Sequence, residues 1–284
     1  MTFIKGCEVH KNIMQSIKSI YSTNYGTENT DLIETVFNDV IDLFNGERSG
    51  FQRCDAQYHD FSHTLQTIPP FIEIIDGWNK AKESSKILKN YFDLGIIAVL
   101  LHDTGYMKTM DDQQGTGAKY TFIHIQRSVD FAGSYLPRIG LTEHQIVVVQ
   151  NAIRCTGVRV ILEDIHFTSE EGKILGFALG TADFLGQMSA PDYIDKLPVL
   201  YKEYEEAYQF EGIEKLRAMG AMIFESPEHL IQNTPFFFEK IVLNRFKAMG
   251  SVYEYLMYHY STPEIPYIKK IQENLTVIKS QFGQ

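Results

Sequence analysis

The sequence predicts an all-helical protein in which residues 1–284 form a single compact domain. Apolar residues recur at the spacing of a helix face in most segments of the chain. Strand-like alternation is scarce, and Val158–Ile161 is the one short candidate for a strand. The chain contains no internal repeat and no linker rich in glycine, proline or serine. Residues 191–284 are therefore expected to form a helical extension packed on the core.

Four helices are expected in the N-terminal part of the chain. Their ranges are 10–20, 31–44, 58–75 and 91–102. The second has Thr30 available as N-cap and Asn45-Gly46 as a stop signal. Pro69-Pro70 should bend or break the third helix, because proline lacks the amide hydrogen that a helix interior requires. The fourth is apolar nearly all round, which is typical of a helix buried at the centre of a protein.

The remaining helices follow a polar loop at residues 111–119, which lacks the Gly-Lys-Ser/Thr sequence of a phosphate-binding loop. Their expected ranges are about 121–136, a buried helix after Thr142, 172–188, 192–210, 234–260 and a last helix after Pro266. Thr142 and Gln145 have capping-box spacing, and so do Thr168 and Glu171. Pro235 is expected in the first turn of the long helix, where proline is tolerated.

Composition and charge restrict the classes of function. Hydrophobic residues make up 44% of the chain, which is enough for a substantial core. A formal net charge of −10 without a cluster of lysine or arginine argues against binding to a nucleic acid polymer or an anionic membrane. Such a charge still allows a small phosphorylated substrate, since a local metal ion can outweigh the global field.

Cysteine usage and the N-terminus predict a cytoplasmic protein. The three cysteines, Cys7, Cys54 and Cys155, form no Cys-x-x-Cys pair and are odd in number, which argues against a disulfide framework. The N-terminal residues lack the apolar core of a signal peptide. The longest apolar run, Ile96–Leu101, is far too short to cross a bilayer.

Four separate places in the sequence carry side chains that can bind a metal, one of which is His124. The apolar segment before residue 102 ends in His102-Asp103, so two ligand-type side chains stand together at the end of a buried element. His59 and His63 are four residues apart and would share one face of a helix. Asp183 stands among small residues in a predicted buried helix, where a carboxylate is costly unless it is paired or bound to a metal.

Taken singly, each of these pieces has a simple structural explanation. A His-x-x-x-His pair is more often structural than functional, and the dipeptide His102-Asp103 arises often by chance. Their order along the chain is more informative. His63, His102-Asp103 and Asp183 resemble the HD superfamily of metal-dependent phosphohydrolases. Residues 58–63 are also similar to the Tyr-His-Asn-x-x-His segment of cyclic nucleotide phosphodiesterases, and the resemblance runs from about Tyr58 to Met188.

The resemblance implies an all-helical fold of the HD/phosphodiesterase type, with a metal-site core over residues 50–190. It implies that a divalent ion, Zn, Mn, Fe or Mg, is held by four residues. These ligands are His63, His102, Asp103 and Asp183. Asp103 would also be catalytic and able to bridge to a second ion. The implied reaction is attack of a metal-activated water on phosphorus, with His59 protonating the leaving oxygen.

The sequence departs from the family pattern in two places. Asp60 replaces the asparagine of the phosphodiesterase segment. Ile153–Thr156 contains no histidine, although some HD proteins carry a further ligand there. A complete second metal site is therefore not expected, and His124 is either a partial second-site ligand, a phosphate contact or an ordinary helix histidine. Gln232 is a candidate base-binding residue, because the phosphodiesterases have a purine-binding glutamine at a similar distance.

The leading hypothesis is a metal-dependent phosphohydrolase that cleaves a small phosphate ester, with nucleotides and cyclic nucleotides among the candidates. A di-iron oxygenase of the HD type is an alternative, against which the missing histidine near Cys155 counts. A non-catalytic helical module that binds a metal or ligand is a second alternative. The sequence does not indicate the oligomeric state.

Overall fold

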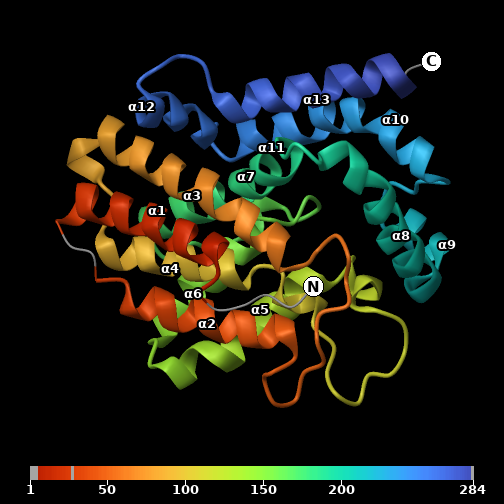
Figure 1. Ribbon diagram of the computed structural model, residues 1–284, viewed down its shortest axis with the longest axis horizontal. Helices are drawn as coiled ribbons and strands as arrows, with labels where there is room; N and C mark the ends of the chain where they lie inside the picture. The colour runs from red at the N-terminus through yellow and green to blue at the C-terminus, as the bar shows by residue number, and fades with distance from the viewer. Residues whose placement is uncertain (1–5, 27–28, 283–284) are drawn as a thin grey trace.

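Helices form the fold in residues 6–26 and 29–282, the part of the chain that the computed structural model describes (Figure 1). The α-helices are α1 (Glu8–Tyr25), α2 (Asp31–Asn45), α3 (Phe61–Ala81), α4 (Lys89–Leu101), α5 (His124–Tyr135), α6 (Glu143–Arg154), α7 (Glu170–Met188), α8 (Tyr193–Glu211), α9 (Ile213–Ala218), α10 (Pro227–Phe237), α11 (Leu243–Ala248), α12 (Leu256–Tyr260) and α13 (Pro266–Phe282). Within these described residues there is no strand, and backbone pairing of the β type is limited to one isolated bridge between Phe51 and Thr109. The all-α prediction is confirmed.

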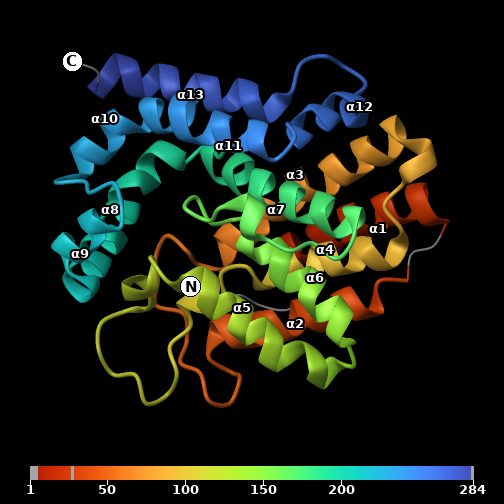
Figure 2. The same ribbon diagram turned by 180° about the vertical axis from the view of Figure 1, so that it is seen from behind.

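The helix α4 occupies the middle of the fold. It packs against α2, α3, α6 and α7. Every residue from Phe92 to Leu101 is buried, as its nearly all-apolar sequence predicts. Figure 1 shows α1 on the near face of this core, and Figure 2 shows α5 and α6 on the opposite face. The end of α4, where the ligand pair begins, is therefore enclosed by other helices.

The C-terminal helices lie along one side of the core. The helix α13 packs against α10 and also reaches α7 and α8. The helices α10 to α13 form the upper layer of Figure 1. The helix α8 turns away from this layer and packs against the loop region near residues 117–120. The C-terminal residues thus contact both the core and the N-terminal half.

The predicted start of α3 is wrong, and Pro69-Pro70 do not break the helix. The helix begins at Phe61 rather than Tyr58, because the Asp60 carboxylate caps it by accepting a hydrogen bond from the His63 amide. It also continues through Pro69-Pro70 to Ala81. The flanking residues Ile68 and Phe71 are fully buried in the core, and this packing outweighs the hydrogen bonds that the two prolines remove.

Some capping predictions are confirmed and others are wrong. Thr142 and Gln145 form the predicted capping box at the start of α6. Gly46 ends α2 in the left-handed conformation with a φ of 75°, as its stop signal predicted. The Thr30 hydroxyl, however, donates to Glu34 instead of capping the backbone of α2. The helix α7 is capped by Ser169 rather than by Thr168, which shifts its start to Glu170.

The long helix predicted from Thr234 to Tyr260 is divided into several pieces. The helix α10 begins at Pro227 after the N-cap Ser226, so Pro235 lies inside it. The chain continues through a π-helical turn, Phe238–Val242, into α11, which ends at Ala248. Ser251, which follows, has a left-handed backbone conformation. The predicted strand at 158–161 is an irregular turn. Across the described residues, no helix is both long and apolar enough to cross a bilayer.

A buried carboxylate joins three helices far from the predicted site. Asp76 on α3 accepts hydrogen bonds from Asn24 on α1 at 2.8 Å and from His259 on α12 at 2.6 Å, and it pairs with Lys80 at 2.7 Å. Burial tends to raise the pKa of Asp76. The three partners have the larger, opposite effect, so the pKa falls to about 2. The ionised carboxylate is therefore part of the folded state at neutral pH.

Replacing Asp76 by alanine is expected to lower the free energy of unfolding by about 2–3 kcal/mol, because it removes a buried carboxylate from the partly buried Asn24 and His259 that it joins. Since the folded carboxyl has a pKa below its usual value of 3.8, its stabilisation is present above about pH 4 and is lost as the pH falls towards 2. Urea unfolding at several pH values measures this difference. The exposed Asp195→Ala variant is the control, and an Asp76→Ala effect that does not shrink towards pH 2 would contradict the assignment.

Candidate metal centre

The predicted ligands converge from three helices. His63 lies in the first turn of α3, His102 and Asp103 directly follow α4, and Asp183 lies within α7. His63 Nε2 is 3.4 Å from Asp103 Oδ2 and 3.1 Å from Asp183 Oδ1. His102 Nε2 is 3.2 Å from Asp103 Oδ2 and 3.7 Å from Asp183 Oδ1. The four side chains therefore face one point, and all four are buried.

Three of the atoms that face this point are close to one another but make no hydrogen bond. Among the described residues, His102 Nε2, Asp103 Oδ2 and Asp183 Oδ1 are buried side-chain atoms without a hydrogen bond. Buried polar atoms are rarely left unpaired, since each costs about 1–3 kcal/mol. Ligand atoms of His63, His102 and Asp103 also lie within 4.8 Å of one another, a spacing at which one ion can bind all three. This buried cluster could hold a metal ion.

Hydrogen bonds on the far side of the rings orient the histidines for this role. His102 Nδ1 lies 2.7 Å from the carbonyl oxygen of Val99. A carbonyl can only accept a hydrogen bond, so Nδ1 carries a proton. Nε2 then faces the carboxylates, with a lone pair when the ring is neutral and with a second proton when the ring is charged. His124 has the same arrangement, with Nδ1 2.7 Å from the oxygen of Thr121.

The charges in the cluster favour a cation. Burial tends to lower the pKa of His102, but the adjacent Asp103 and Asp183 carboxylates raise it well above its usual value. Burial tends to raise the pKa of both aspartates, but the two histidines hold them well below the usual range. Two ionised carboxylates in a buried site need compensating positive charge, which protons on the histidines or a metal ion can supply.

Glycines allow the close packing that forms the cluster. A Cβ at Gly186 on α7 would lie 2.4 Å from the Gln66 oxygen on α3, so α3 and α7 can approach only with glycine there. Gly186 is one turn beyond Asp183, and Gln66 is one turn beyond His63. A Cβ at Gly105 would lie 1.9 Å from the His124 oxygen, so this glycine lets α5 start beside Asp103.

His124 lies on the other side of Asp103. Its Nε2 atom is 3.7 Å from Asp103 Oδ1, whereas Oδ2 faces His63 and His102. Burial lowers the pKa of His124 to about 4, so the ring is neutral at pH 7. The predicted helix containing His124 begins at this residue and not near 121. The structure thus brings His124 to the site, where Asp103 separates it from the other two histidines.

His59 reaches the site from a different position than predicted. It precedes α3 and is not on the same helix face as His63, although the two ring centroids are 5.4 Å apart. The Tyr106 ring stacks on both His59 and His124, with centroid distances of 4.4 Å and 4.6 Å, and the two histidine rings are themselves 6.1 Å apart. Stacking on Tyr106, rather than helical spacing, places His59 beside the cluster.

Glu203 on α8 is a site residue that sequence reasoning missed. Its Oε2 atom is 2.6 Å from His59 Nδ1, and its Oε1 atom accepts from the Tyr58 amide at 2.7 Å. Burial alone would lower the pKa of His59, but the Glu203 carboxylate raises it above the usual value. Glu203 is buried, although the surrounding sequence is that of an acidic amphipathic helix. Its burial and its contact with His59 identify it as a site residue, and both arise from the fold rather than from the local sequence.

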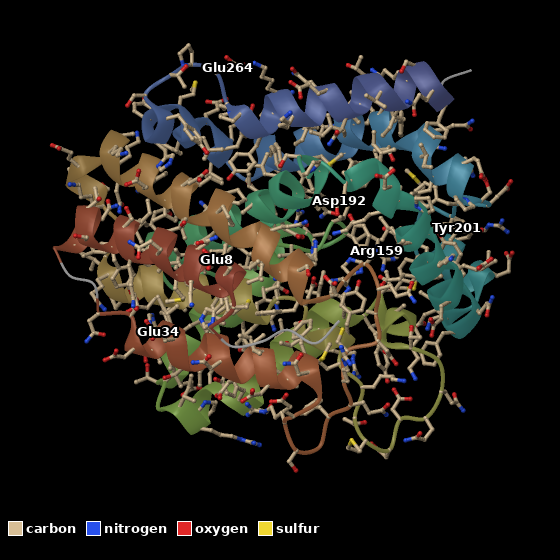
Figure 3. All side chains as sticks on the ribbon, viewed as in Figure 1. Glu8, Glu34, Arg159, Asp192, Tyr201 and Glu264 are labelled. Carbon is tan, nitrogen blue, oxygen red and sulfur yellow. The ribbon has the colours of Figure 1, made fainter. Side chains whose placement is uncertain are left out.

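The site opens into a cavity of about 670 Å³. His59, His63, Asp103, His124 and Asp183 line one part of it, and Arg154 and Arg159 also face the space. Figure 3 shows Arg159 beside α8, and its guanidinium lies 5.2 Å from the centre of the Phe122 ring.

Neither Gln232 nor Arg127 lines this cavity. Gln232 is exposed and does not line the space, whereas its neighbour Asn233 does. The structure therefore does not support Gln232 as a base-binding residue. Arg127 is held by the Gly105 and Met107 oxygens, at 2.7 Å and 2.8 Å, so its guanidinium supports the backbone that follows Asp103.

The sequence matches the family described as Npun_R2479-like over residues 7–257. The chain belongs to this family. The match extends from α1 into α12 and includes all four predicted ligands, His59 and Glu203. Among curated proteins, none matches the sequence significantly.

The position at which some HD proteins carry another histidine is part of the core here. Cys155 is fully buried, and a Cβ at Gly176 on α7 would lie 2.7 Å from its sulfur. Burial raises the pKa of the Cys155 thiol to about 12, so the thiol is neutral at pH 7. The preceding Arg154 faces the cavity instead. This segment supplies a cation to the cavity and no metal ligand.

Proposed function

We propose that this protein is a metal-dependent phosphohydrolase that cleaves a small phosphate ester. The observation that carries the proposal is the buried cluster of two histidines and two carboxylates, in which the side chains face one point and three inward-facing atoms make no hydrogen bond. The order of these residues along the chain resembles the HD superfamily, which acts on phosphate esters. The all-helical fold and the nearby His59–Glu203 pair agree with this resemblance.

His63, His102, Asp103 and Asp183 would hold the ion. Nitrogen and carboxylate oxygen ligands in this number suit Zn, Mn, Fe or Mg. A divalent ion bound there supplies Lewis-acid chemistry, because it polarises a phosphoryl oxygen and acidifies a water molecule. Asp103 Oδ1 and His124 Nε2 are the two atoms available to a second ion, which would otherwise need water or substrate as ligands.

His59 would act as the general acid. Its Nδ1–H group is held by Glu203, so its Nε2 atom is free to hold and donate a proton. The raised pKa of His59 favours the protonated form that a leaving alkoxide needs. Arg154 and Arg159 can pair with phosphate oxygens within the same cavity.

A panel of phosphomonoesters and phosphodiesters, assayed with added Mn²⁺ or Mg²⁺, tests this proposal. We expect the protein to hydrolyse at least one class and to lose that activity when a chelator removes the ion. Absence of hydrolysis from a protein that contains metal would contradict the proposal. An iron-dependent visible absorption band in that inactive protein would indicate the oxygenase alternative.

A further inference from the structure

The cavity beyond the ligand cluster is mainly apolar. Its wall away from the histidines comes from the end of α7, from α8, from α10 and from the segment before α10. The apolar side chains there include Met188, Leu197, Leu200, Phe224, Leu230 and Phe237. A volume of about 670 Å³ is far larger than a phosphate group requires. The wall therefore surrounds the rest of the bound molecule, and its chemistry indicates what that part is.

The mouth of the cavity carries exposed apolar side chains. Ile123, Val158, Ile161 and Met222 all line the cavity, and each is between 39% and 60% exposed. Single exposed apolar residues are common on protein surfaces, but a group of them around one opening marks a binding surface. The apolar wall thus continues to the outside of the protein.

The amide side chains in the cavity are already engaged with the protein. Gln126 donates from its amide nitrogen to the Asp130 carboxylate, Gln187 donates to the backbone carbonyl of Asp183, and Asn233 donates to the backbone carbonyl of His229. The Thr234 hydroxyl donates to the Leu230 oxygen. Recognition of a nucleobase needs several free donors and acceptors in fixed positions. The cavity provides a polar end and a largely apolar wall, to which α8 and α10 contribute four polar side chains, Tyr193, Tyr204, Asn233 and Thr234.

We infer that the substrate is a phosphate ester of an apolar alcohol, with the phosphate at the ligand cluster and the hydrocarbon along the wall between α8 and α10. This inference rests on the proposed function for the identity of the headgroup. The hydrocarbon would lie against the side chains of Leu197, Leu200 and Leu230 and extend towards Met222 at the mouth. Burial of each methylene in such a wall strengthens binding by up to about fourfold.

Alkylphosphonic acids test the inference, because their carbon–phosphorus bond resists hydrolysis and binding can be measured without turnover. Calorimetry would compare the ethyl, butyl and octyl compounds, in excess Mn²⁺ and below micelle-forming concentrations. We expect affinity to rise with each added methylene, up to about fourfold per group. Equal affinity for the ethyl and octyl compounds would overturn the inference. Tighter binding of the phosphonate analogue of a nucleoside monophosphate than of octylphosphonic acid would also overturn it.

A matched pair of methionine variants locates the hydrocarbon. Met222 and Met110 are both exposed, but only Met222 lines the cavity. We expect Met222→Gln to reduce the ratio of octyl to ethyl affinity by about three- to tenfold, and Met110→Gln to leave that ratio unchanged. The same ratio in both variants would contradict the predicted path.

The outcome is distinguishable from failure of the proposed function. Chain-length preference in a protein that hydrolyses no phosphate ester would support the apolar binding wall and contradict the phosphohydrolase. Hydrolysis of short esters without chain-length preference would do the reverse.

Discussion

Replacing Asp103 by asparagine is expected to abolish metal binding and hydrolysis together. Asp103 is the carboxylate that faces three histidines, with Oδ2 towards His63 and His102 and Oδ1 towards His124. Asparagine keeps the shape of the side chain but removes the negative charge that a divalent ion needs. Elemental analysis should find no bound metal in the variant. Its rate of hydrolysis should equal that of the chelator-treated parent protein.

The control for this variant is Asp195→Asn, a change of the same kind at an exposed position on α8. It should keep both the metal content and the activity of the parent protein. Circular dichroism and thermal unfolding would show whether the Asp103→Asn variant is folded. A folded Asp103→Asn protein with unchanged metal content would show that this carboxylate is not a ligand.

Replacing His59 by asparagine is expected to keep the ion but slow hydrolysis by about 10²–10⁴-fold, the usual contribution of a general acid. His59 stands beside the ligand cluster, with its ring held by Tyr106 and Glu203. The matched control is His144→Asn, because His144 is exposed on α6. If the His59 variant retained the parent turnover rate, His59 would not be the proton donor.

Glu203→Gln separates positioning from proton donation. Burial alone lowers the pKa of His59, and the Glu203 carboxylate raises it, so removing that charge should lower it. A general acid must be protonated, and activity therefore falls as the pH rises above its pKa. In the Glu203→Gln variant this falling limb of the pH–rate profile should move to lower pH. A merely structural role for Glu203 would change the rate without moving the limb.

Much of the fold and part of the site could be predicted from the sequence, because local pattern determines them. The apolar segment before His102 is so uniform that its burial in the core follows directly. Stop and capping signals at Gly46 and Thr142 act within a few residues, and the structure confirms both. The convergence of His63, His102, Asp103 and Asp183 rested on resemblance, and in the fold these side chains face one point.

Long-range packing determined what the sequence did not indicate. Glu203 is 144 residues from His59 along the chain, and no periodicity links the two positions. Pro69 and Pro70 remain inside α3 because their neighbours are buried, which local propensity does not include. Gln232 and Asn233 are adjacent, and the direction of α10 alone decides which of them reaches the cavity. Sequence spacing can therefore suggest a site residue without placing its side chain.

The location of the bound ion tests the central claim most directly. Crystals of the full chain grown with excess Mn²⁺ would be measured by anomalous diffraction at the manganese absorption edge. We expect an anomalous peak among His63 Nε2, His102 Nε2 and the facing oxygens of Asp103 and Asp183. Absence of a peak there, or a peak only elsewhere in the protein, would contradict the proposed metal centre and the chemistry built on it.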